Sequence, residues 1–145
     1  MSDSFVTPIE VRWSDLDPNY HVRHSVYYDY GAYCRICFLN SHDVTSAFFT
    51  QHHFGPILFR EECVFRREIK LGDVVTIDLQ LLKSRPDYSR WTIQHTFTRN
   101  NEHAATLSLD GAWIDTLQRK LTIPPELARV SFEKMPRAKT FEWAK

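Results

Sequence analysis

The sequence predicts an α+β domain in which one long helix precedes a run of antiparallel strands. Three observations lead to this prediction. Apolar residues recur at helical spacing near residues 25–41, apolar and polar residues alternate from residue 57 onward, and tight-turn signals separate the alternating runs. The chain has 145 residues, enough to bury a core without disulfide or metal staples. We therefore predict a single domain over residues 1–145, with a C-terminal arm over about residues 119–145.

The N-terminal part predicts one strand followed by a loop. Residues 4–12 alternate in part and predict a strand, which Pro8 places at an edge or a bulge. Residues 13–24 are polar, include Pro18 and Asn19, and hold neither the helical nor the strand period. We therefore expect a loop that leads directly into the helix.

From Ser25 the spacing of apolar residues becomes helical. The apolar positions are Val26, Tyr27, Tyr30, Tyr33, Cys34, Ile36, Cys37 and Phe38. Ser25 is the expected N-cap, and Asn40-Ser41 the expected end. A helix that is apolar nearly all round must be buried on several sides, which predicts a sheet wrapped around it. Gly31 costs roughly 1 kcal/mol relative to Ala in a helix, so its presence predicts a close backbone approach. A second short helix is expected over 44–51.

After Gly55-Pro56 the pattern predicts four antiparallel strands. In residues 57–71 the apolar side chains fall on odd positions, namely Phe59, Cys63, Phe65, Ile69 and Leu71. The other strands are expected over 75–81, 91–98 and 107–113. One helix covers only one face of such a sheet, so we expect a second copy of the chain to bury the remaining surface or edge. The C-terminal piece predicts a short helix and an extended arm that packs on this partner.

Composition and charge argue against several classes of function. The 18 basic and 18 acidic residues balance, so there is no electrostatic case for binding nucleic acid. No stretch approaches the ~18 consecutive apolar residues of a membrane span, and the N-terminus lacks the features of a signal peptide. The 3 cysteines are expected to be reduced thiols, as in a cytoplasmic protein.

Residues 15–28, Asp-Leu-Asp-Pro-Asn-Tyr-His-Val-Arg-His-Ser-Val-Tyr-Tyr, resemble the signature of the hydroxybenzoyl-CoA thioesterase branch of the hotdog superfamily. The matching residues are Asp15, Asp17, Pro18, His21, Tyr27 and, further along the helix, Arg35. The likeness covers roughly residues 5–118. It implies the hotdog fold, an antiparallel sheet of about five strands wrapped around one long central helix, and hydrolysis of an acyl-CoA thioester.

Three departures from the family pattern bear on the chemistry. Ala32 stands where many relatives carry a helix-borne Glu, which leaves Asp17 as the expected catalytic carboxylate. Tyr20 replaces a usual Gly, and Arg23-His24 replace a usual Asn-Asn pair. These last changes reshape the expected pocket mouth and leave the acyl group open.

Thioester hydrolysis needs a carboxylate that attacks the carbonyl carbon or takes a proton from water, and donors for the developing oxyanion. The resemblance implies that Asp17 is this nucleophile or general base. It also implies that a backbone N–H near His24, at the positive start of the helix, polarises the carbonyl. Without the resemblance, Asp-Pro-Asn is ordinary turn chemistry. Asp15 is expected to have a structural hydrogen-bonding role.

The candidate substrate-binding residues are His21, Arg23, His24, Tyr27 and Glu61. His21 either positions the substrate or Asp17, or bonds the loop backbone, and Arg23 either contacts phosphate or is solvated. Glu61 interrupts an apolar strand face, which fits an ion pair, a dimer contact, or a carboxylate given to a partner's site.

The resemblance further implies that Arg85 and Arg90 bind the CoA phosphates. No cofactor is expected beyond the CoA of the substrate. Asp17, His21 and His24 also have metal-ligand chemistry, but three residues on one irregular loop are weak evidence, and no metal is predicted. Cys34 and Cys37 lie within an apolar helical stripe and are expected to pack in the core.

Our first hypothesis is therefore an acyl-CoA thioesterase that acts as a homodimer or homotetramer, a dimer of dimers, with sites at the subunit interface. The alternative is a non-catalytic hotdog module that binds an acyl or aromatic ligand, because the residues around Asp17 are altered. A hotdog dehydratase fits less well, since the loop carries an Asp-centred and not a His-centred motif.

Overall fold

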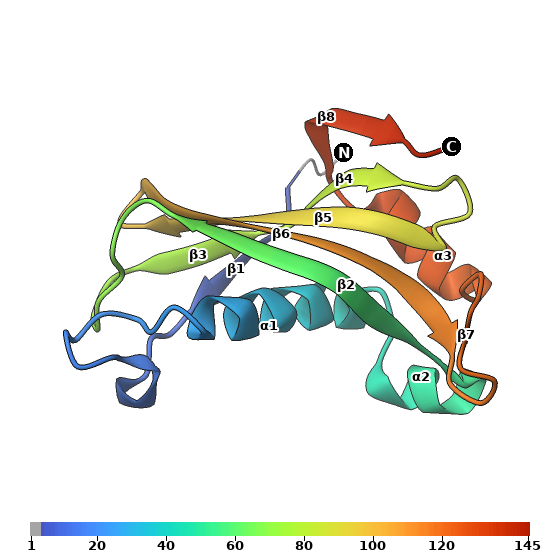
Figure 1. Cartoon of the computed structure of the whole chain (residues 1–145), viewed down its shortest axis with the longest axis horizontal. Coiled ribbons are helices and arrows are strands. Elements are labelled where there is room, and N and C mark those ends of the chain that lie inside the picture. Colours follow the sequence, from blue (N-terminus) through green and yellow to red (C-terminus); the bar gives the residue numbers. More distant parts are fainter. Residues whose placement is uncertain (1–3) are drawn as a thin grey trace.

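The computed structural model describes residues 4–145 and confirms the α+β class and the wrapped-helix architecture (Figure 1). The elements in chain order are β1 (Val6–Ile9), the 3-10 turn η1 (Trp13–Asp15), α1 (Val26–Ser41), α2 (Ser46–His52), β2 (Phe54–Phe65), β3 (Val75–Asp78), β4 (Gln80–Ser84), β5 (Arg90–Arg99), β6 (Glu102–Asp115), β7 (Lys120–Leu121), α3 (Glu126–Lys134) and β8 (Arg137–Trp143). The long helix begins and ends where its apolar period predicts.

The strands form one curved sheet with β5 near its centre. Strand β5 pairs along one side with β6, and along the other with β4 and β3 in succession. The predicted strand over 75–81 is therefore two short strands, interrupted at Leu79. Strand β1 extends the sheet beside β3, and β8 extends it beside β4. The described sheet has eight strands, more than the expected five, because β4 separates from β3 and short β7 and β8 are added.

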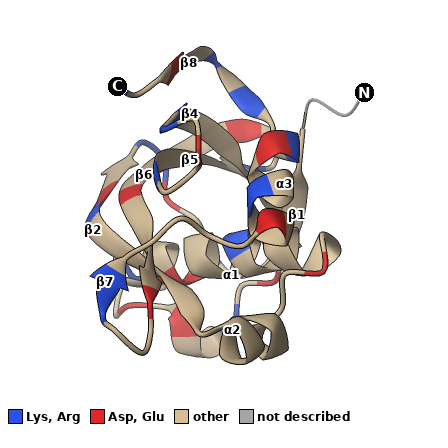
Figure 2. Ribbon diagram, turned by 90° about the vertical axis from the view of Figure 1, so that its right-hand side faces the viewer, with Lys and Arg blue, Asp and Glu red and all other residues tan. Residues whose placement is uncertain are grey.

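Helix α1 packs one face against the concave side of the sheet (Figure 2). Its buried residues are Val26, Tyr27, Tyr30, Gly31, Cys34, Phe38 and Leu39. Burial on several sides of the helix was a wrong prediction: Tyr33 is 52% exposed, because the sheet covers a single side. The close approach predicted at Gly31 is confirmed, since a Cβ there would collide with the side chain of Leu107.

Strand β2 departs from its predicted alternation. Leu58 pairs with Gly111 and Arg60 with Asp110, so Phe59 is an extra, bulged residue that shifts the phase of the strand. The Phe59 ring lies under the Arg90 guanidinium, 4.8 Å from its centroid.

Placing Phe59 on the same face as Cys63 and Phe65 was therefore wrong. The strand also ends at Phe65, short of the predicted Leu71, because the N–H groups of Arg66 and Arg67 both donate to the Ala104 carbonyl.

The C-terminal arm folds onto its own chain. Strand β8 pairs in parallel with β4, and Phe132 of α3 packs against the rings of Trp91 and Trp113. Within the described chain, β8 thus occupies the sheet edge that β4 provides, and the expectation that this arm also packs on a partner stays a prediction. All three cysteines are free thiols. Within residues 4–145, no helix is both long and apolar enough to cross a membrane.

Candidate active site

The loop before α1 is anchored by the buried carboxylate of Asp15. This group accepts hydrogen bonds from the Tyr30 hydroxyl at 2.8 Å, from Arg12 Nη2 at 2.9 Å and from the Arg12 backbone N–H at 3.0 Å. Burial favours the neutral acid, but these bonds outweigh it and hold the pKa of Asp15 below its usual value. Asp15 therefore has the structural role expected of it, and fixes the loop to the helix.

Asp17 lies in a tight turn that leaves half of its carboxylate free. Its backbone N–H donates to the His21 carbonyl at 2.8 Å, and its carbonyl accepts from Tyr20 N–H at 2.9 Å. Its Oδ1 accepts the N–H of Asn19 at 2.8 Å and that of His21 at 3.2 Å. Among the described residues, Oδ2 has no hydrogen-bond partner. The turn thus uses one oxygen to hold the side chain and presents the other.

A cavity of about 360 Å³ brings four of the predicted residues together. They are Asp17, His21, His24 and Tyr27, and the wall is completed by Asn19, Val22, Phe65, Arg66, Arg67 and Glu68. Burial raises the pKa of the Tyr27 hydroxyl to about 12. His21 Nε2 lies 3.0 Å from Glu68 Oε2, so this histidine is oriented by a carboxylate as well as by the loop.

The segment that leads into α1 carries a candidate backbone donor on His24, a residue of the same cavity as Asp17. Ser25 precedes the helix as predicted, but its side chain does not cap the helix backbone and instead accepts from Arg23 Nε at 3.3 Å. In the described part of the chain, the N–H of His24 has no acceptor. A free N–H at the positive end of a helix can bind an oxygen that develops negative charge.

Two other predicted residues lie outside this cavity. Arg23 braces the loop, because its Nη1 donates to the Ser14 carbonyl at 2.9 Å. Glu61 on β2 faces α1, with its Oε2 3.9 Å from Arg35 Nη2. This is the ion pair that was one of the three expectations for Glu61, and it is separate from Asp17 of the same chain.

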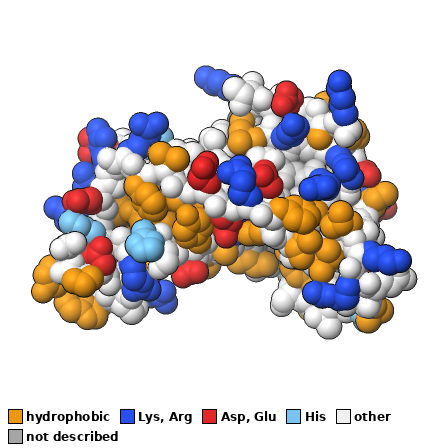
Figure 3. All heavy atoms as spheres, viewed as in Figure 1, with side chains coloured by type: hydrophobic (Ala, Val, Ile, Leu, Met, Phe, Trp, Pro, Cys, Tyr) orange, Lys and Arg blue, Asp and Glu red, His pale blue; other side chains and the backbone are white. Residues whose placement is uncertain are grey.

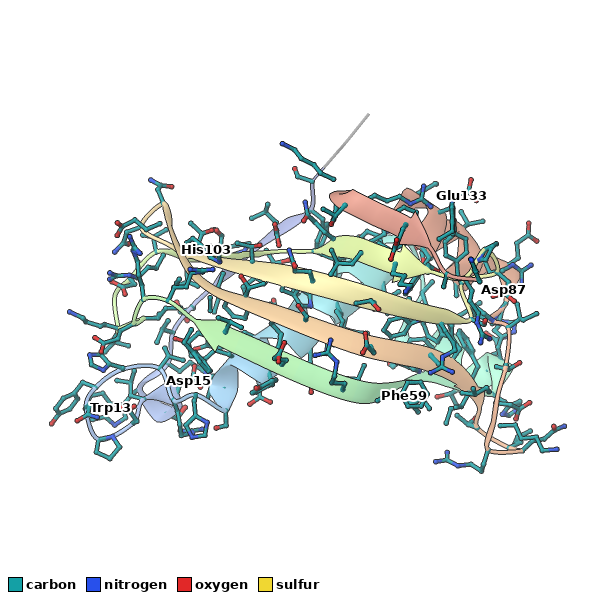
Figure 4. All side chains as sticks on the ribbon, turned by 45° about the horizontal axis from the view of Figure 1, so that its top comes forward. Trp13, Asp15, Phe59, Asp87, His103 and Glu133 are labelled. Carbon is teal, nitrogen blue, oxygen red and sulfur yellow. The ribbon has the colours of Figure 1, made fainter. Side chains whose placement is uncertain are left out.

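Arg85 and Arg90 meet in a second cavity, of about 340 Å³, at the other end of the sheet. Lys83 and Lys145 also border it, so the cavity is predominantly basic. The rings of Tyr27 and Phe97 are 5.3 Å apart, which marks the end of β5 nearest the start of α1. Arg90 lies seven residues from Phe97 along the same strand, roughly 23 Å away at the usual rise per residue. The loop of Asp15 and the turn of Asp87 accordingly lie at opposite ends in Figure 4.

Sequence reasoning missed the residues that complete the walls of these cavities. Arg66, Arg67 and Glu68 had been assigned to a continuous strand, although the adjacent arginines already break its alternation. His95 was counted with the apolar positions of β5. A histidine at such a position was the available sequence signal, because its side chain is fully buried and needs a polar contact inside the core. Across residues 4–145, no three His, Cys, Asp or Glu side chains cluster closely enough to hold a metal ion.

Solved structures confirm the hotdog fold. A hypothetical protein from Staphylococcus aureus, in complex with CoA, superposes with a TM-score of 0.84 at 21% identity, covering 98% of this chain and 90% of that one. A thioesterase from Thermus thermophilus, complexed with coenzyme A and Zn, gives 0.72 at 26%, covering 90% and 93%. A 1,4-dihydroxy-2-naphthoyl-CoA thioesterase from Synechocystis gives 0.81 at 14%, covering 93% and 99%.

The sequence itself identifies the family. No curated protein matches the chain significantly. The sequence model of the Thioesterase-like superfamily matches residues 11–130, which is most of the chain and includes every candidate residue discussed above. The predicted enzyme class, a thioester hydrolase, is confirmed at the level of the family. The chain belongs to the Thioesterase-like superfamily.

Proposed function

We propose that this protein hydrolyses an acyl-CoA thioester to the free acid and CoA, with Asp17 as its catalytic carboxylate. One observation carries the proposal: Asp17 and His24 line the same cavity, and within residues 4–145 neither Asp17 Oδ2 nor the His24 N–H has a hydrogen-bond partner. A carboxylate and an oxyanion donor on one cavity wall are the two groups that acyl transfer to water requires.

The two groups support a simple sequence of steps. As a general base, Asp17 takes a proton from water while the water oxygen bonds to the carbonyl carbon, and the His24 N–H donates to the oxyanion. The C–S bond then breaks, and the leaving thiolate takes the proton from Asp17. As a nucleophile, Asp17 instead bonds to the carbonyl carbon, releases the thiolate, and forms an anhydride that water cleaves. A single turnover in water labelled with heavy oxygen separates the two routes. Incorporation of the label into the Asp17 carboxylate identifies nucleophilic attack by Asp17.

The CoA carrier is supported by the basic cavity at the other end of the sheet. Arg85 and Arg90, with Lys83, offer the cationic contacts that phosphates need. The two similar solved structures that are complexes with CoA add support. We also propose a cytoplasmic location, because the cysteines are expected to be reduced thiols.

We further propose that the active unit is a homodimer paired along β2. Within residues 4–145, β2 pairs with β6 on one side and with no strand on the other. Along it, Leu58, Phe59, Val64 and Phe65 are exposed, and Figure 3 shows hydrophobic side chains gathered in two areas on this side, with charged groups between them. A long, apolar, open strand is a template for pairing.

Twofold pairing of β2 with itself is antiparallel, so it would bring the opposite ends of two copies together. Asp17 of one copy would then share an end of the joined sheet with Arg85 and Arg90 of the other. The Arg85 turn lies where the strands end. A CoA molecule bound in the basic cavity on the outer face of the sheet can therefore extend around this end to the face that α1 covers. Pairing of two such dimers into a homotetramer remains a prediction.

The test is Asp17→Asn, assayed by release of free thiol from a panel of acyl-CoA thioesters. Loss of the acid–base group should lower kcat by about 10³-fold, while the far-UV spectrum and melting temperature stay near those of the wild type. Asp43→Asn is the matched control, since Asp43 is exposed at the other end of α1 and Asn tolerates its left-handed backbone (φ 66°).

Unchanged turnover by Asp17→Asn would overturn the role of Asp17. If the wild type binds a CoA thioester tightly and releases no thiol from any member of the panel, the non-catalytic binding module replaces the hydrolase.

A further inference from the structure

A separate cavity of about 260 Å³ lies beside the C-terminal half of α1. Most of its wall is apolar: Trp91, Trp113 and Phe132 contribute rings, and Ile36 and Leu58 contribute aliphatic groups. Asp17 of the same chain borders a different cavity, at the start of the helix. None of these residues takes part in the chemical steps proposed for Asp17 and His24.

Arg35 is the single charged side chain on this wall among the described residues, and only 15% of it is exposed. Its Nη1 lies 3.0 Å from His95 Nε2. A guanidinium has five N–H donors, and this is its only hydrogen bond within residues 4–145. Most of its donors therefore have no acceptor.

The neighbours of Arg35 compensate its charge incompletely. His95 Nδ1 bonds the Asp78 carbonyl at 2.8 Å, so Nδ1 carries the proton and Nε2 is the acceptor for Arg35. Burial lowers the pKa of His95 to about 3, which keeps this ring neutral at ordinary pH. The carboxylate that pairs with Arg35 is Glu61, but its Oε2 is 3.9 Å from Arg35 Nη2, too far for a hydrogen bond, and 28% of its side chain is exposed.

The aromatic wall also has donors without acceptors. The indole N–H groups of Trp91 and Trp113 are buried, and neither has a hydrogen-bond partner in the described part of the chain. The side chains around the cavity are thus rich in donors and poor in acceptors. An occupant made only of hydrocarbon would exclude water from the Arg35 donors and leave them unpaired, which is costly.

The cavity is bordered by exposed groups on the side where the second copy would pair. Ala32 on α1 is exposed, and Leu58 on β2 is 39% exposed. Antiparallel pairing of β2 would set the Phe65 end of the partner against this mouth. Phe65 borders the Asp17 cavity, so the catalytic carboxylate of one copy would face the apolar cavity of the other.

We propose that this cavity receives the acyl group of the substrate, and that Arg35 donates hydrogen bonds to an oxygen of that acyl group other than the thioester carbonyl. The proposal rests on the proposed hydrolase function and names its substrate class. The acyl group has an apolar body and a second oxygen function, a hydroxyl, keto or carboxyl group. Glu61 tunes which of these binds best, because its negative charge competes with a carboxylate and can accept from a hydroxyl.

The test compares thioesters that differ in one oxygen function. Hexanoyl-CoA is assayed against its terminally hydroxylated, keto and carboxylated counterparts, and benzoyl-CoA against hydroxylated and carboxylated benzoyl-CoA. For the best oxygenated member, kcat/KM should exceed that of its plain counterpart by about tenfold or more, the discrimination expected when a buried donor is otherwise unpaired. Arg35→Met, close in shape but without donors, should reduce this ratio to about one, whereas Arg35→Lys should retain part of it.

Glu61→Gln provides an independent arm, because it removes the neighbouring negative charge and leaves the Arg35 side chain in place. It should raise the preference for the carboxylated substrate severalfold and leave the preference for the hydroxylated one unchanged or lower. If Arg35→Met does not fold, the wild-type ratios and Glu61→Gln decide. Hydrolysis with all ratios near one, and no effect of Glu61→Gln, would overturn the inference while the hydrolase function stands. No hydrolysis of any thioester would instead overturn the proposed function.

Discussion

The two ends of the sheet are built for different tasks. At the end where α1 begins, an irregular polar loop holds one buried carboxylate and presents another. At the opposite end, the inside of the sheet borders an apolar cavity and the outside a basic one. At the first end, the Asp17 carboxylate borders a cavity lined mainly by polar side chains. At the second end, an apolar cavity and a basic one lie far from that carboxylate of the same chain. This difference is what we expect if each proposed active site is shared by two copies of the chain.

The basic end is tested by the double variant Arg85→Gln, Arg90→Gln. If these side chains bind phosphate, KM for an acyl-CoA should rise about 100-fold, because two charge-assisted contacts are lost. Asp17→Asn, at the other end, should lower kcat instead. Steady-state kinetics with acyl-CoA and with the acyl-N-acetylcysteamine thioester, which lacks phosphates, measures both effects.

The short thioester is the control within this experiment, since its KM should not change in the double variant. Lys139→Gln is a matched surface control, because Lys139 is an exposed cation outside the basic cavity. Equal increases of KM for both substrates would remove the phosphate-binding role from Arg85 and Arg90.

At the end where α1 begins, Asp15→Asn separates the structural carboxylate from the proposed catalytic carboxylate of Asp17. The buried Asp15 accepts bonds from Arg12 and Tyr30, so its loss should cost about 2 kcal/mol of unfolding free energy at pH 7. Because folding lowers the pKa of Asp15, this stabilisation is present above its unfolded pKa of about 3.9 and is lost as the pH falls through its folded pKa.

Urea unfolding between pH 7 and acidic pH measures this contribution. The difference in stability between the wild type and Asp15→Asn should shrink as the pH falls below about 4. A difference that stays constant down to the lowest pH at which both proteins fold would contradict an ionised Asp15 in the native state.

The smallest expected effect at this end is that of Glu68→Gln. Glu68 pairs with His21 at 3.0 Å, but two thirds of its side chain is exposed (66%), so solvent and salt screen the pair. We expect kcat/KM to fall by less than about threefold. A loss comparable to that of Asp17→Asn would instead make His21 and Glu68 part of the chemistry.

The features of the fold that the sequence predicted correctly are those that depend on residues close together in the chain. The bounds of α1 and the turns after β2 follow from spacing and turn residues within a few positions, and they were predicted correctly. The bulge at Phe59 was not, since an aromatic residue fits the alternation and only the pairing of β2 with β6 makes it the extra residue. The position of β8 beside β4 likewise depends on an edge that no local pattern reveals.

The same distinction applies to the candidate site. Asp17, His21, His24 and Tyr27 come from one short segment, so their assembly in one cavity follows from the motif. Arg35, Glu61 and His95 come from three separate elements, and their contacts arise only when α1 packs against the sheet. Each looks ordinary in its own segment, which is why only their packing together reveals a polar centre.

Subunit complementation tests the central claim, that each site is shared by two copies, most directly. Asp17→Asn and the Arg85→Gln, Arg90→Gln double variant are each assayed alone at low acyl-CoA concentration, then unfolded together in equal amounts, refolded and assayed again. If the sites are shared, the mixture should recover about a quarter of the wild-type rate, because half of the randomly formed dimers are mixed and each has one intact site. A mixture no more active than the mean of the two separate variants would contradict the shared site.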